Sequence, residues 1–312
     1  MKRVLVTGSN GLLGQKLTDI YRAVENVELI ATGRGADRYP EKNGYEYVSL
    51  DITNAKEVNS IFNTYKPDCV IHTAAMTNVD ACELDHDACV LQNIEAVKIV
   101  TEAAEAIKAH LIHLSTDFIF DGVDGPYKED ATPNPLSFYG DSKLKGEEIV
   151  MAWSSNYAIA RTVLVYGLVA DMSRTNIVLW AKDALENRKT INVVDDQYRT
   201  PTLAEDLAMG CRLIELHKAT GIYNISGKDY MNIFELVEQV AAYFKLPMDL
   251  VGRVSSLTLN QPAKRPPVSG FIIDKAVKEL GYNPHSFAEG IAIIQQQFES
   301  FNSKLRNEAG KN

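Results

Sequence analysis

Short runs of apolar residues alternate with longer stretches of helical periodicity along the first half of the chain. The apolar runs predict buried strands at 4–6, 27–32, 48–50, 68–72, 111–115 and 157–161. The periodic stretches predict helices at 11–24, at 54–65, at 83–109 with a break near Asp87, and at 140–153. Strands that alternate with helices form a parallel sheet covered on both faces, because right-handed crossovers place the helices there. We therefore expect an α/β fold, with a doubly wound parallel sheet of the Rossmann type and a second, smaller α/β lobe.

Three glycines follow the first predicted strand, at Gly8, Gly11 and Gly14. Glycine permits a tight turn and a close approach of the backbone to a pyrophosphate, and the helix that follows presents free N–H groups to the phosphates. A simple strand–turn–helix joint is the alternative. The position directly after the first strand favours a dinucleotide site.

The ends of the second and third strands bear on the choice of dinucleotide. Arg34 stands where an acidic residue would bind the hydroxyl groups of the adenosine ribose. A guanidinium can hold a 2′-phosphate instead, so we expect NADP(H) to be favoured, with NAD(H) as the alternative. Arg34 could also be a solvated loop residue. Asp51 could accept a hydrogen bond from the adenine amino group or cap a turn.

Tyr139 and Lys143 lie one helical turn apart, at the start of the helix predicted after the fifth strand. An unperturbed tyrosine has a pKa of about 10, and a nearby ammonium group stabilises the phenolate and lowers that pKa. We expect Tyr139 to exchange a proton with a carbonyl or alcohol oxygen, and Lys143 to bond the nicotinamide ribose. Thr116, or Ser115 beside it, is expected to orient the same oxygen. An ordinary pair on a helix surface is the alternative.

The composition excludes several classes of function. The 312 residues carry a formal charge of −9 and contain no dense run of Lys and Arg, which argues against a nucleic-acid partner. No apolar run reaches the length of a membrane span or resembles the core of a signal peptide, so we expect a cytoplasmic protein without a membrane partner. The four cysteines form no close pair of the zinc or thioredoxin type and are expected to be reduced thiols.

Two further groups of polar residues have simpler explanations than chemistry. His72 and His113 lie in or beside apolar strands, where a packed core histidine is expected. An acidic cluster falls where a loop meets a helix start, a place at which carboxylates favour the helix dipole, so we expect no metal site there. Its members are Asp80, Glu83, Asp85, His86 and Asp87.

Several segments together resemble a known family, the extended short-chain dehydrogenase/reductases, and within it the branch of dTDP-4-dehydrorhamnose reductases. Besides the glycine run, the segments that carry the resemblance are 72–80, 115–122, 139–147, 161–167, 196–202 and 265–266. They span nearly the whole chain. The resemblance implies an NAD(P)H-dependent reductase of a nucleotide-linked 4-keto-6-deoxysugar, with a nucleotide sugar as the partner.

The resemblance also assigns roles to residues by position. The catalytic residues would be Thr116, Tyr139 and Lys143. The residues that line the cofactor would be Gly8, Asn10, Gly11, Leu12, Gly14, Asp51, Ile52, Ala74, Ala75, Thr77, Asn93, Tyr139 and Lys143, to which the sequence argument adds Arg34. The candidates on the sugar-nucleotide side would be Val79, Asn176, Gln197 and Arg265, of which Arg265 suits a diphosphate as a bidentate cation.

Some features depart from the pattern of the branch or leave alternatives open. Lys16 aligns with a glutamate that some relatives use in a magnesium-linked dimer contact, so we carry no metal over, although a homodimer remains an expectation. Arg199 stands where many bacterial reductases have a small residue. The branch also resembles a regulatory subunit of methionine adenosyltransferase, which binds dinucleotide. Epimerase or dehydratase chemistry stays open because Asp117 follows Thr116, as in dehydratases.

The pattern of the chain changes after the first half. Helical stretches at 233–243 and 287–298 flank a proline-rich loop at 260–267, and residues 195–202 are polar and loop-like. The domains that we predict are a dinucleotide-binding domain of residues 1–167, joined by about 196–222; a substrate lobe of 168–195 and 223–301; and a solvated, frayed tail of 302–312.

Overall fold

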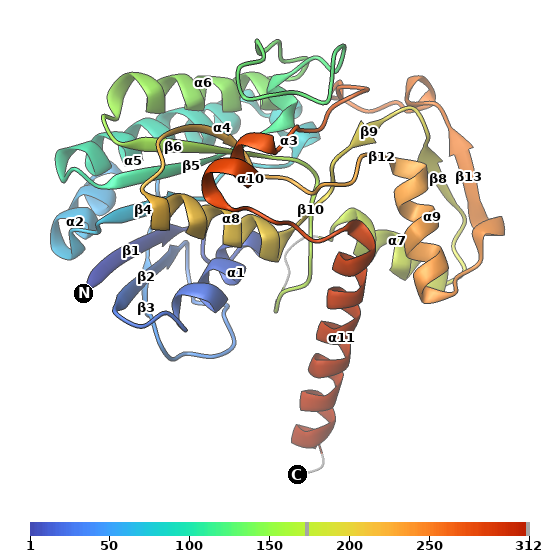
Figure 1. Ribbon diagram of the computed structural model, residues 1–312, viewed down its shortest axis with the longest axis horizontal. Helices are drawn as coiled ribbons and strands as arrows, with labels where there is room; N and C mark the ends of the chain where they lie inside the picture. The colour runs from blue at the N-terminus through green and yellow to red at the C-terminus, as the bar shows by residue number, and fades with distance from the viewer. Residues whose placement is uncertain (172–174, 310–312) are drawn as a thin grey trace.

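A computed structural model describes residues 1–171 and 175–309 of the chain. Its centre is a seven-stranded parallel sheet with the order β11-β6-β5-β4-β1-β2-β3 (Figure 1). The strands are β1 (Lys2–Thr7), β2 (Val27–Gly33), β3 (Glu46–Ser49), β4 (Cys69–His72), β5 (His110–Thr116), β6 (Tyr157–Thr162) and β11 (Gly221–Asn224). The chain winds outward from β1 in both directions, which confirms the predicted doubly wound sheet of the Rossmann type.

Helices cover both faces of this sheet. The helical elements around it are α1 (Leu12–Tyr21), α2 (Ala55–Tyr65), α3 (Val79–Leu84), α4 (His86–Val90), the π-helical turn Leu91–Glu95, α5 (Ala96–Ala106), the 3₁₀ turn Asp117–Ile119, α6 (Phe138–Trp153), α8 (Ala204–His217) and α10 (Asp274–Leu280). Side chains of α2, α5 and α6 join one apolar core with alternate strand residues such as Leu5 and Leu111. Side chains of α1, α8 and α10 join the other core, with Val4 and Ile112. Successive strand residues point to opposite faces, so each strand feeds both cores.

A second group of elements packs beside the sheet around a separate apolar core, and we call it the outer cluster. It consists of α7 (Ile177–Glu186), β8 (Ile191–Val194), α9 (Ile233–Phe244), the 3₁₀ turn Met248–Leu250, β13 (Val251–Val254) and the start of α11 (Phe287–Ala309). Short strand pairs lie between the outer cluster and the sheet: β7 (Val165–Tyr166) with β10 (Thr202–Leu203), and β9 (Tyr198–Arg199) with β12 (Met231–Asn232). A further 3₁₀ turn covers Ser256–Thr258. In Figure 1 the outer cluster lies at the right of the sheet.

Several element boundaries differ from the predicted ones. The long helix expected at 83–109 begins at Val79, and its break falls at Asp85, because the Asp85 side chain caps α4 by accepting a hydrogen bond from Ala88 N. Residues 198–199 of the expected loop form β9. Helix α11 runs on to Ala309, into the segment expected to be a frayed tail. Residues 310–312 of that tail and 172–174 of the expected substrate lobe lie outside the described residues.

The domain boundaries given above remain a prediction, but the packing of two elements bears on how the chain is organised. Strand β11 pairs with β6 at the edge of the main sheet, so the chain returns to the sheet after it has contributed α7 and β8 to the outer cluster. Helix α10 packs against α8 and β11, through residues such as Ala276 and Leu280. The chain therefore crosses between the sheet and the outer cluster more than once.

A buried ion pair joins α6 to the sheet. Arg161 on β6 donates two hydrogen bonds to the carboxylate of Glu147, from Nε at 2.9 Å and from Nη2 at 2.7 Å, and both side chains are nearly inaccessible to solvent. Arg161 also donates to the carbonyl oxygen of Glu129 at 3.1 Å. The pair fixes the rotation of α6 about its axis, and with it the direction in which Tyr139 and Lys143 point.

We predict that Glu147→Gln lowers the free energy of unfolding by about 3 kcal/mol, because it leaves the Arg161 charge buried without a counter-charge. The double variant Glu147→Gln/Arg161→Met should recover more than half of that loss. The matched control is Lys145→Gln, which breaks the solvent-exposed pair with Asp141 on the same helix and should cost at most about 0.5 kcal/mol. Urea denaturation measures all three, and equal losses for Glu147→Gln and Lys145→Gln would contradict the prediction.

Candidate active site

The carboxyl ends of β1, β4 and β5 lie next to one another in the sheet. The strand order reverses at β1, and ligands of doubly wound folds bind in the crevice at such a reversal. Gly8 follows β1, Ala74 and Ala75 follow β4, and Thr116 ends β5. The topology therefore brings together three segments that the sequence predicted as parts of one site.

The glycine run forms a tight turn that only small residues allow. Gly8 has a φ of 72°, and a Cβ there would lie 2.8 Å from the Thr73 hydroxyl oxygen and 2.9 Å from Ala74 N. A Cβ on Gly14 would lie 2.3 Å from the Gly8 carbonyl oxygen, while Gly11 N donates to that oxygen at 2.9 Å. Gly11 begins α1 without any side-chain cap. The first N–H groups of α1 are therefore available to an anionic group such as a pyrophosphate.

Asn10 shapes the loop that follows β2. Its side-chain amide donates to the Ala36 carbonyl oxygen at 3.0 Å and to the Tyr47 hydroxyl at 3.1 Å, and its side-chain oxygen accepts from Arg38 N at 2.8 Å. The predicted cofactor residue Asn10 thus holds the loop that carries Arg34. The Arg34 side chain itself is exposed at the end of β2.

Asp51 follows β3 and caps a turn. It accepts hydrogen bonds from Thr53 N at 3.0 Å and from the Thr53 hydroxyl at 2.8 Å. These bonds, led by the one from the backbone, hold the pKa of Asp51 below its usual value, and the nearby Arg34 charge adds to the effect. Asp51 therefore caps a turn, which was one of the two roles expected from the sequence, and it lies near Arg34. Its neighbour Ile52 is buried.

Asn93 lies in the π-helical turn, and its side chain is fully engaged by the protein. Its Oδ1 accepts from Met76 N at 2.8 Å, and its Nδ2 donates to Met76 O at 3.0 Å and to the Ser142 hydroxyl at 3.1 Å. The residue is completely buried. Asn93 therefore positions the loop that carries Ala74, Ala75 and Thr77, and its place among the residues that line the cofactor stays a prediction.

Helix α6 carries the predicted acid and its partner on one buried face. Ser137 caps the helix by accepting a hydrogen bond from Gly140 N at 3.2 Å, which sets Tyr139 in the first turn and Lys143 one turn later. A Cβ on Gly140 would lie 2.1 Å from the Phe118 carbonyl oxygen, so the start of α6 packs directly on the turn after β5. Tyr139 consequently reaches the Thr116 hydroxyl and forms a hydrogen bond with it.

The electrostatics of Tyr139 differ from the prediction. Burial raises its pKa well above the usual value, the hydrogen bond with Thr116 opposes this rise, and Asp117, Cys82 and Cys89 add to it. The expected lowering by Lys143 is not found. Burial also lowers the pKa of Lys143, to about 8, against the opposing charge of Glu147. Both shifts share one physical cause, because removal from water disfavours the charged form of either group.

Lys143 is held from below by the sheet. Its Nζ donates to the Leu114 carbonyl oxygen at 2.6 Å and lies 3.5 Å from His113 Nε2. His113 and His72 are both 1% exposed, and their rings lie 5.4 Å apart, so the expectation of core histidines is confirmed. His72 forms a hydrogen bond with the Thr7 hydroxyl group, whose oxygen lies 2.8 Å from His72 Nδ1. Polar contacts thus join β1 to β4 and β5 to α6 under the site, and the two histidine rings pack against each other between them.

The candidates on the sugar-nucleotide side are only partly brought together. Arg265 donates to the Asp80 carboxylate at 2.8 Å, which places it beside Val79 at the start of α3. Gln197 is buried just before β9. Asn176 caps α7 by accepting from Leu179 N at 3.2 Å and donates to Gly167 O at 2.7 Å, so its side chain is used within the fold.

Sequence reasoning left four residues out of the site that the structure places in it: Asp80, Asp117, Arg199 and Ser269. Asp117 is 2% exposed and accepts hydrogen bonds from Thr116 Oγ1 at 3.1 Å and from the Ser269 hydroxyl, while Arg199 Nε lies 3.7 Å from it. The signal for Asp117 and Arg199 was visible in the motifs, as an acid beside Thr116 and as an unusual arginine. Ser269 gave no signal, because nothing in the sequence shows that it contacts Asp117.

The acidic cluster is explained by helix starts and local pairs. Asp80 binds Arg265, Asp85 caps α4, and Glu83 accepts a hydrogen bond from Phe138 N at 3.0 Å. Over residues 1–171 and 175–309, no three His, Cys, Asp or Glu side chains gather as metal ligands would. Lys16, the residue at the position of the metal-linked glutamate, forms an ion pair with Glu205 at 2.9 Å. All four cysteines are buried, and none of them forms a disulfide.

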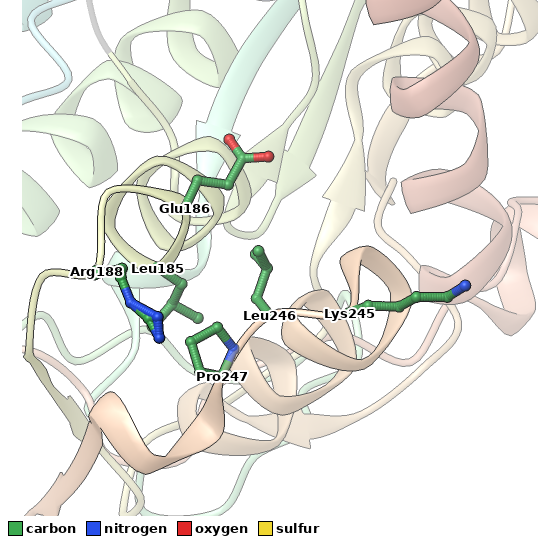
Figure 2. A pocket seen from close by; sticks show the side chains of 6 residues that line it. All are labelled: Leu185, Glu186, Arg188, Lys245, Leu246 and Pro247. Carbon is green, nitrogen blue, oxygen red and sulfur yellow. The ribbon is translucent and has the colours of Figure 1, made fainter.

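A surface hollow of about 540 Å³ lies elsewhere, between the C-terminal ends of α7 and α9 (Figure 2). Its lining residues are Leu185, Glu186, Arg188, Lys245, Leu246 and Pro247. None of them belongs to the predicted catalytic, cofactor or substrate sets, so the reaction is not placed there. None of the helices in the described part of the chain combines the length and the apolar character needed to span a lipid bilayer.

Comparison with known proteins identifies relatives of the whole chain. A dTDP-4-dehydrorhamnose reductase of Aggregatibacter actinomycetemcomitans is 30% identical over 313 residues, covering 96% of this chain and all of its own length. Methionine adenosyltransferase 2 subunit beta of Xenopus tropicalis is 32% identical over 251 residues, covering 79% of this chain and 73% of its own length. The crystal structure of dTDP-4-dehydrorhamnose reductase from Bacillus anthracis in complex with NADP superposes with a TM-score of 0.81 at 29% identity, covering 95% of this chain and 100% of the other. The family described as the RmlD substrate binding domain matches residues 1–300, and the chain belongs to this family.

Proposed function

We propose that the protein is an NAD(P)H-dependent reductase of a nucleotide-linked 4-keto-6-deoxysugar, and specifically a dTDP-4-dehydrorhamnose reductase that forms dTDP-L-rhamnose. One observation carries the proposal: Thr116, Tyr139 and Lys143 are buried together at the carboxyl ends of the strands. The glycine turn with the uncapped start of α1 lies at the end of a nearby strand of the same sheet. A site of this composition joins a dinucleotide cradle to a proton donor.

The roles of the three residues follow from their contacts. The reduced nicotinamide supplies the hydride to the C4 carbonyl carbon of the sugar. Tyr139 gives its proton to the carbonyl oxygen, and Thr116, whose own hydroxyl proton goes to Asp117 at 3.1 Å, orients the phenol. Lys143, fixed by Leu114 O, offers its remaining N–H groups to the ribose. Because burial raises the Tyr139 pKa, the phenol keeps its proton at neutral pH, which suits reduction.

NADP(H) is the favoured dinucleotide and NAD(H) the alternative. Arg34 stands exposed at the end of β2, close to Asp51, and no acidic residue occupies the immediate end of that strand. A guanidinium there would pair with a 2′-phosphate, whereas a carboxylate would repel it. The NADP complex of the Bacillus anthracis reductase agrees with this choice.

The substrate would lie between the sheet and the outer cluster. Arg265 is the group for the diphosphate, with Val79, Gln197 and Asn176 nearby along the chain segments that border this side. We keep the division into a dinucleotide-binding domain and a substrate lobe, a cytoplasmic location and a homodimer as parts of the proposal. Buried thiols that form no disulfide are the state expected in a reducing compartment.

A second function is a dinucleotide-binding regulatory subunit, favoured by the 32% identity to methionine adenosyltransferase 2 subunit beta. The complete Thr116, Tyr139 and Lys143 set argues for turnover instead. Dehydratase chemistry is less well supported, because the Asp117 carboxylate is already bound by Ser269, Thr116 and Arg199 and is not free to act as an acid.

A panel of 4-keto-6-deoxysugar nucleotides, each assayed with NADPH and with NADH, tests the proposed function. Consumption of NADPH with dTDP-4-dehydrorhamnose, faster than consumption of NADH, is the expected result. Dinucleotide binding without turnover on any sugar, together with a stable complex with a methionine adenosyltransferase catalytic subunit, would establish the regulatory function instead.

We predict that Tyr139→Phe lowers kcat by at least about a hundredfold while the Kd for NADPH changes less than threefold, because it removes only the transferable proton. Steady-state assays and fluorescence titration measure the two quantities. Tyr243→Phe, an exposed position on α9, is the matched control and should behave as the parent protein. Normal turnover by Tyr139→Phe would refute the assigned acid.

We predict that Gly8→Ala weakens NADPH binding by at least about tenfold, because its Cβ collides with Thr73 and Ala74 in the phosphate turn. Gly281→Ala is the control: its φ of 68° is equally left-handed, but nothing lies within 4 Å of the added carbon. Both variants should lose about 1 kcal/mol of stability from the backbone conformation. Isothermal titration calorimetry compares their affinities, and equal affinities would count against the cradle.

A further inference from the structure

A short segment of the second half of the chain, residues 263–269, crosses the active site, and we call it the strap. Its first part is tied to α3. Ala263 N donates to Asp80 Oδ1 at 3.2 Å, and Arg265 donates to Asp80 Oδ2 at 2.8 Å. Asp80 is thus the first anchor of the strap, and it holds the guanidinium that would receive a diphosphate.

The middle of the strap is held by Arg199 on β9. Its guanidinium donates to Pro266 O at 2.8 Å and to Pro267 O at 3.3 Å, as well as to Tyr198 O at 2.7 Å. The two prolines have no N–H to donate, so the position of this stretch depends on donors to its carbonyl groups, which are Arg199 and the backbone N–H of Tyr198, 2.8 Å from Pro267 O. Arg199 is 4% exposed and supplies a rigid fork of such donors.

The end of the strap meets the catalytic turn. Ser269 donates to the carboxylate of Asp117, which also accepts from the Thr116 hydroxyl at 3.1 Å. The third contact of that carboxylate is Arg199, whose Nε lies 3.7 Å from Oδ2. A buried carboxylate without a counter-charge is strongly unfavourable, so Arg199 and Asp117 need each other.

We propose that Arg199 and Asp117 are positioning residues that form a neutral, buried latch, which docks the strap onto the catalytic turn and fixes the hydroxyl of Thr116. The latch is made of a guanidinium on β9 and a carboxylate after β5, and each also binds the strap itself. It links the segment that carries Arg265 to the residue that bonds Tyr139. Substrate binding and proton transfer are therefore coupled through one ion pair.

The latch has two separate consequences for the reaction. The Thr116 hydroxyl gives its proton to Asp117 and accepts from Phe118 N at 3.3 Å, so its oxygen has a fixed direction. The charge of Asp117 faces Tyr139 and disfavours the phenolate, and Arg199 balances that charge. The polar and titratable groups that face Tyr139 are Thr116 on β5, Asp117 after it, Cys82 on α3, Cys89 on α4 and Lys143 on α6. Those that face Asp117 and Arg199 from the second half of the chain are Ser269, Tyr230 and Arg265.

The test uses three variants of the full chain and rests on the proposed function for its kinetic part. Asp117→Asn leaves the Arg199 charge without its counter-charge, so Tyr139 and Lys143 lose their protons more easily. The decrease of kcat for keto-sugar reduction at high pH, which we call the alkaline fall of kcat, should move to lower pH by about one unit. Asp117→Asn/Arg199→Met removes both charges and should return the fall to within a few tenths of a unit of the parent profile. A purely structural role would not produce this return.

Arg199→Lys keeps the charge but loses the fork that binds Pro266 and Pro267. The KM for the keto-sugar nucleotide should rise about tenfold, with the alkaline fall of kcat unchanged and the Kd for NADPH the same. A change in kcat alone, or an equal loss of dinucleotide affinity, would overturn the docking role. An Asp117→Asn profile equal to that of the parent, or one that the second substitution does not restore, would overturn the latch.

A measurement without turnover separates failure of the latch from failure of the proposed function. The ¹³Cε resonance of Lys143, assigned by its loss in Lys143→Gln, is followed in labelled protein from pH 7 to about pH 11, a range that includes its pKa of about 8. It should begin to titrate at lower pH in Asp117→Asn than in the parent and the double variant. This result supports the latch even if no keto-sugar is reduced, and an unchanged onset overturns it.

Discussion

The site depends on the burial of the Lys143 ammonium group against β5, near the carboxyl ends of the strands. Among the residues that the structure describes, Lys143 Nζ contacts the Leu114 carbonyl oxygen and the His113 ring, and burial lowers its pKa to about 8 against the opposing charge of Glu147. A polar or anionic partner that approaches from the strand ends would stabilise the charged form of this buried ammonium group. The same burial keeps Tyr139 protonated at neutral pH. Helix α6 maintains both, because Glu147 and Arg161 fix its rotation on the sheet.

The strand ends are joined to one another by short hydrogen bonds, which makes them one site. Thr7 accepts hydrogen bonds from Thr73 N at 3.2 Å and Ala74 N at 3.3 Å, and the Thr73 hydroxyl donates to Thr7 O at 2.7 Å. The glycine turn after β1 is therefore fixed to the loop after β4. That loop is fixed in turn by Asn93, which also bonds Ser142 on α6. The glycine turn and helix α6, which carries Tyr139, thus have a set relative position.

The fold, and the gathering of Thr116, Tyr139 and Lys143 near the strand ends, could be predicted from the sequence, because their signals are local. Apolar runs gave the strands, and a four-residue spacing gave the face of α6. The break expected near Asp87 falls two residues earlier, because the Asp85 side chain caps α4, and the start of α3 at Val79 was missed because Asn78 caps it before the apolar periodicity begins. Contacts between distant segments could not be predicted either: Ser269 reaches Asp117 across 152 positions. The Tyr139 pKa was misjudged because spacing shows a neighbouring charge but does not show burial.

The central claim is that hydride and proton meet at one carbonyl group held between the glycine turn and α6. Its most direct test is an isotope transfer with NADPH deuterated at both C4 positions of the nicotinamide and dTDP-4-dehydrorhamnose as the acceptor. The account predicts that the product carries one deuterium at C4 of the sugar, detected by mass spectrometry and located by NMR. A product without deuterium, or deuterium at another carbon, would contradict it.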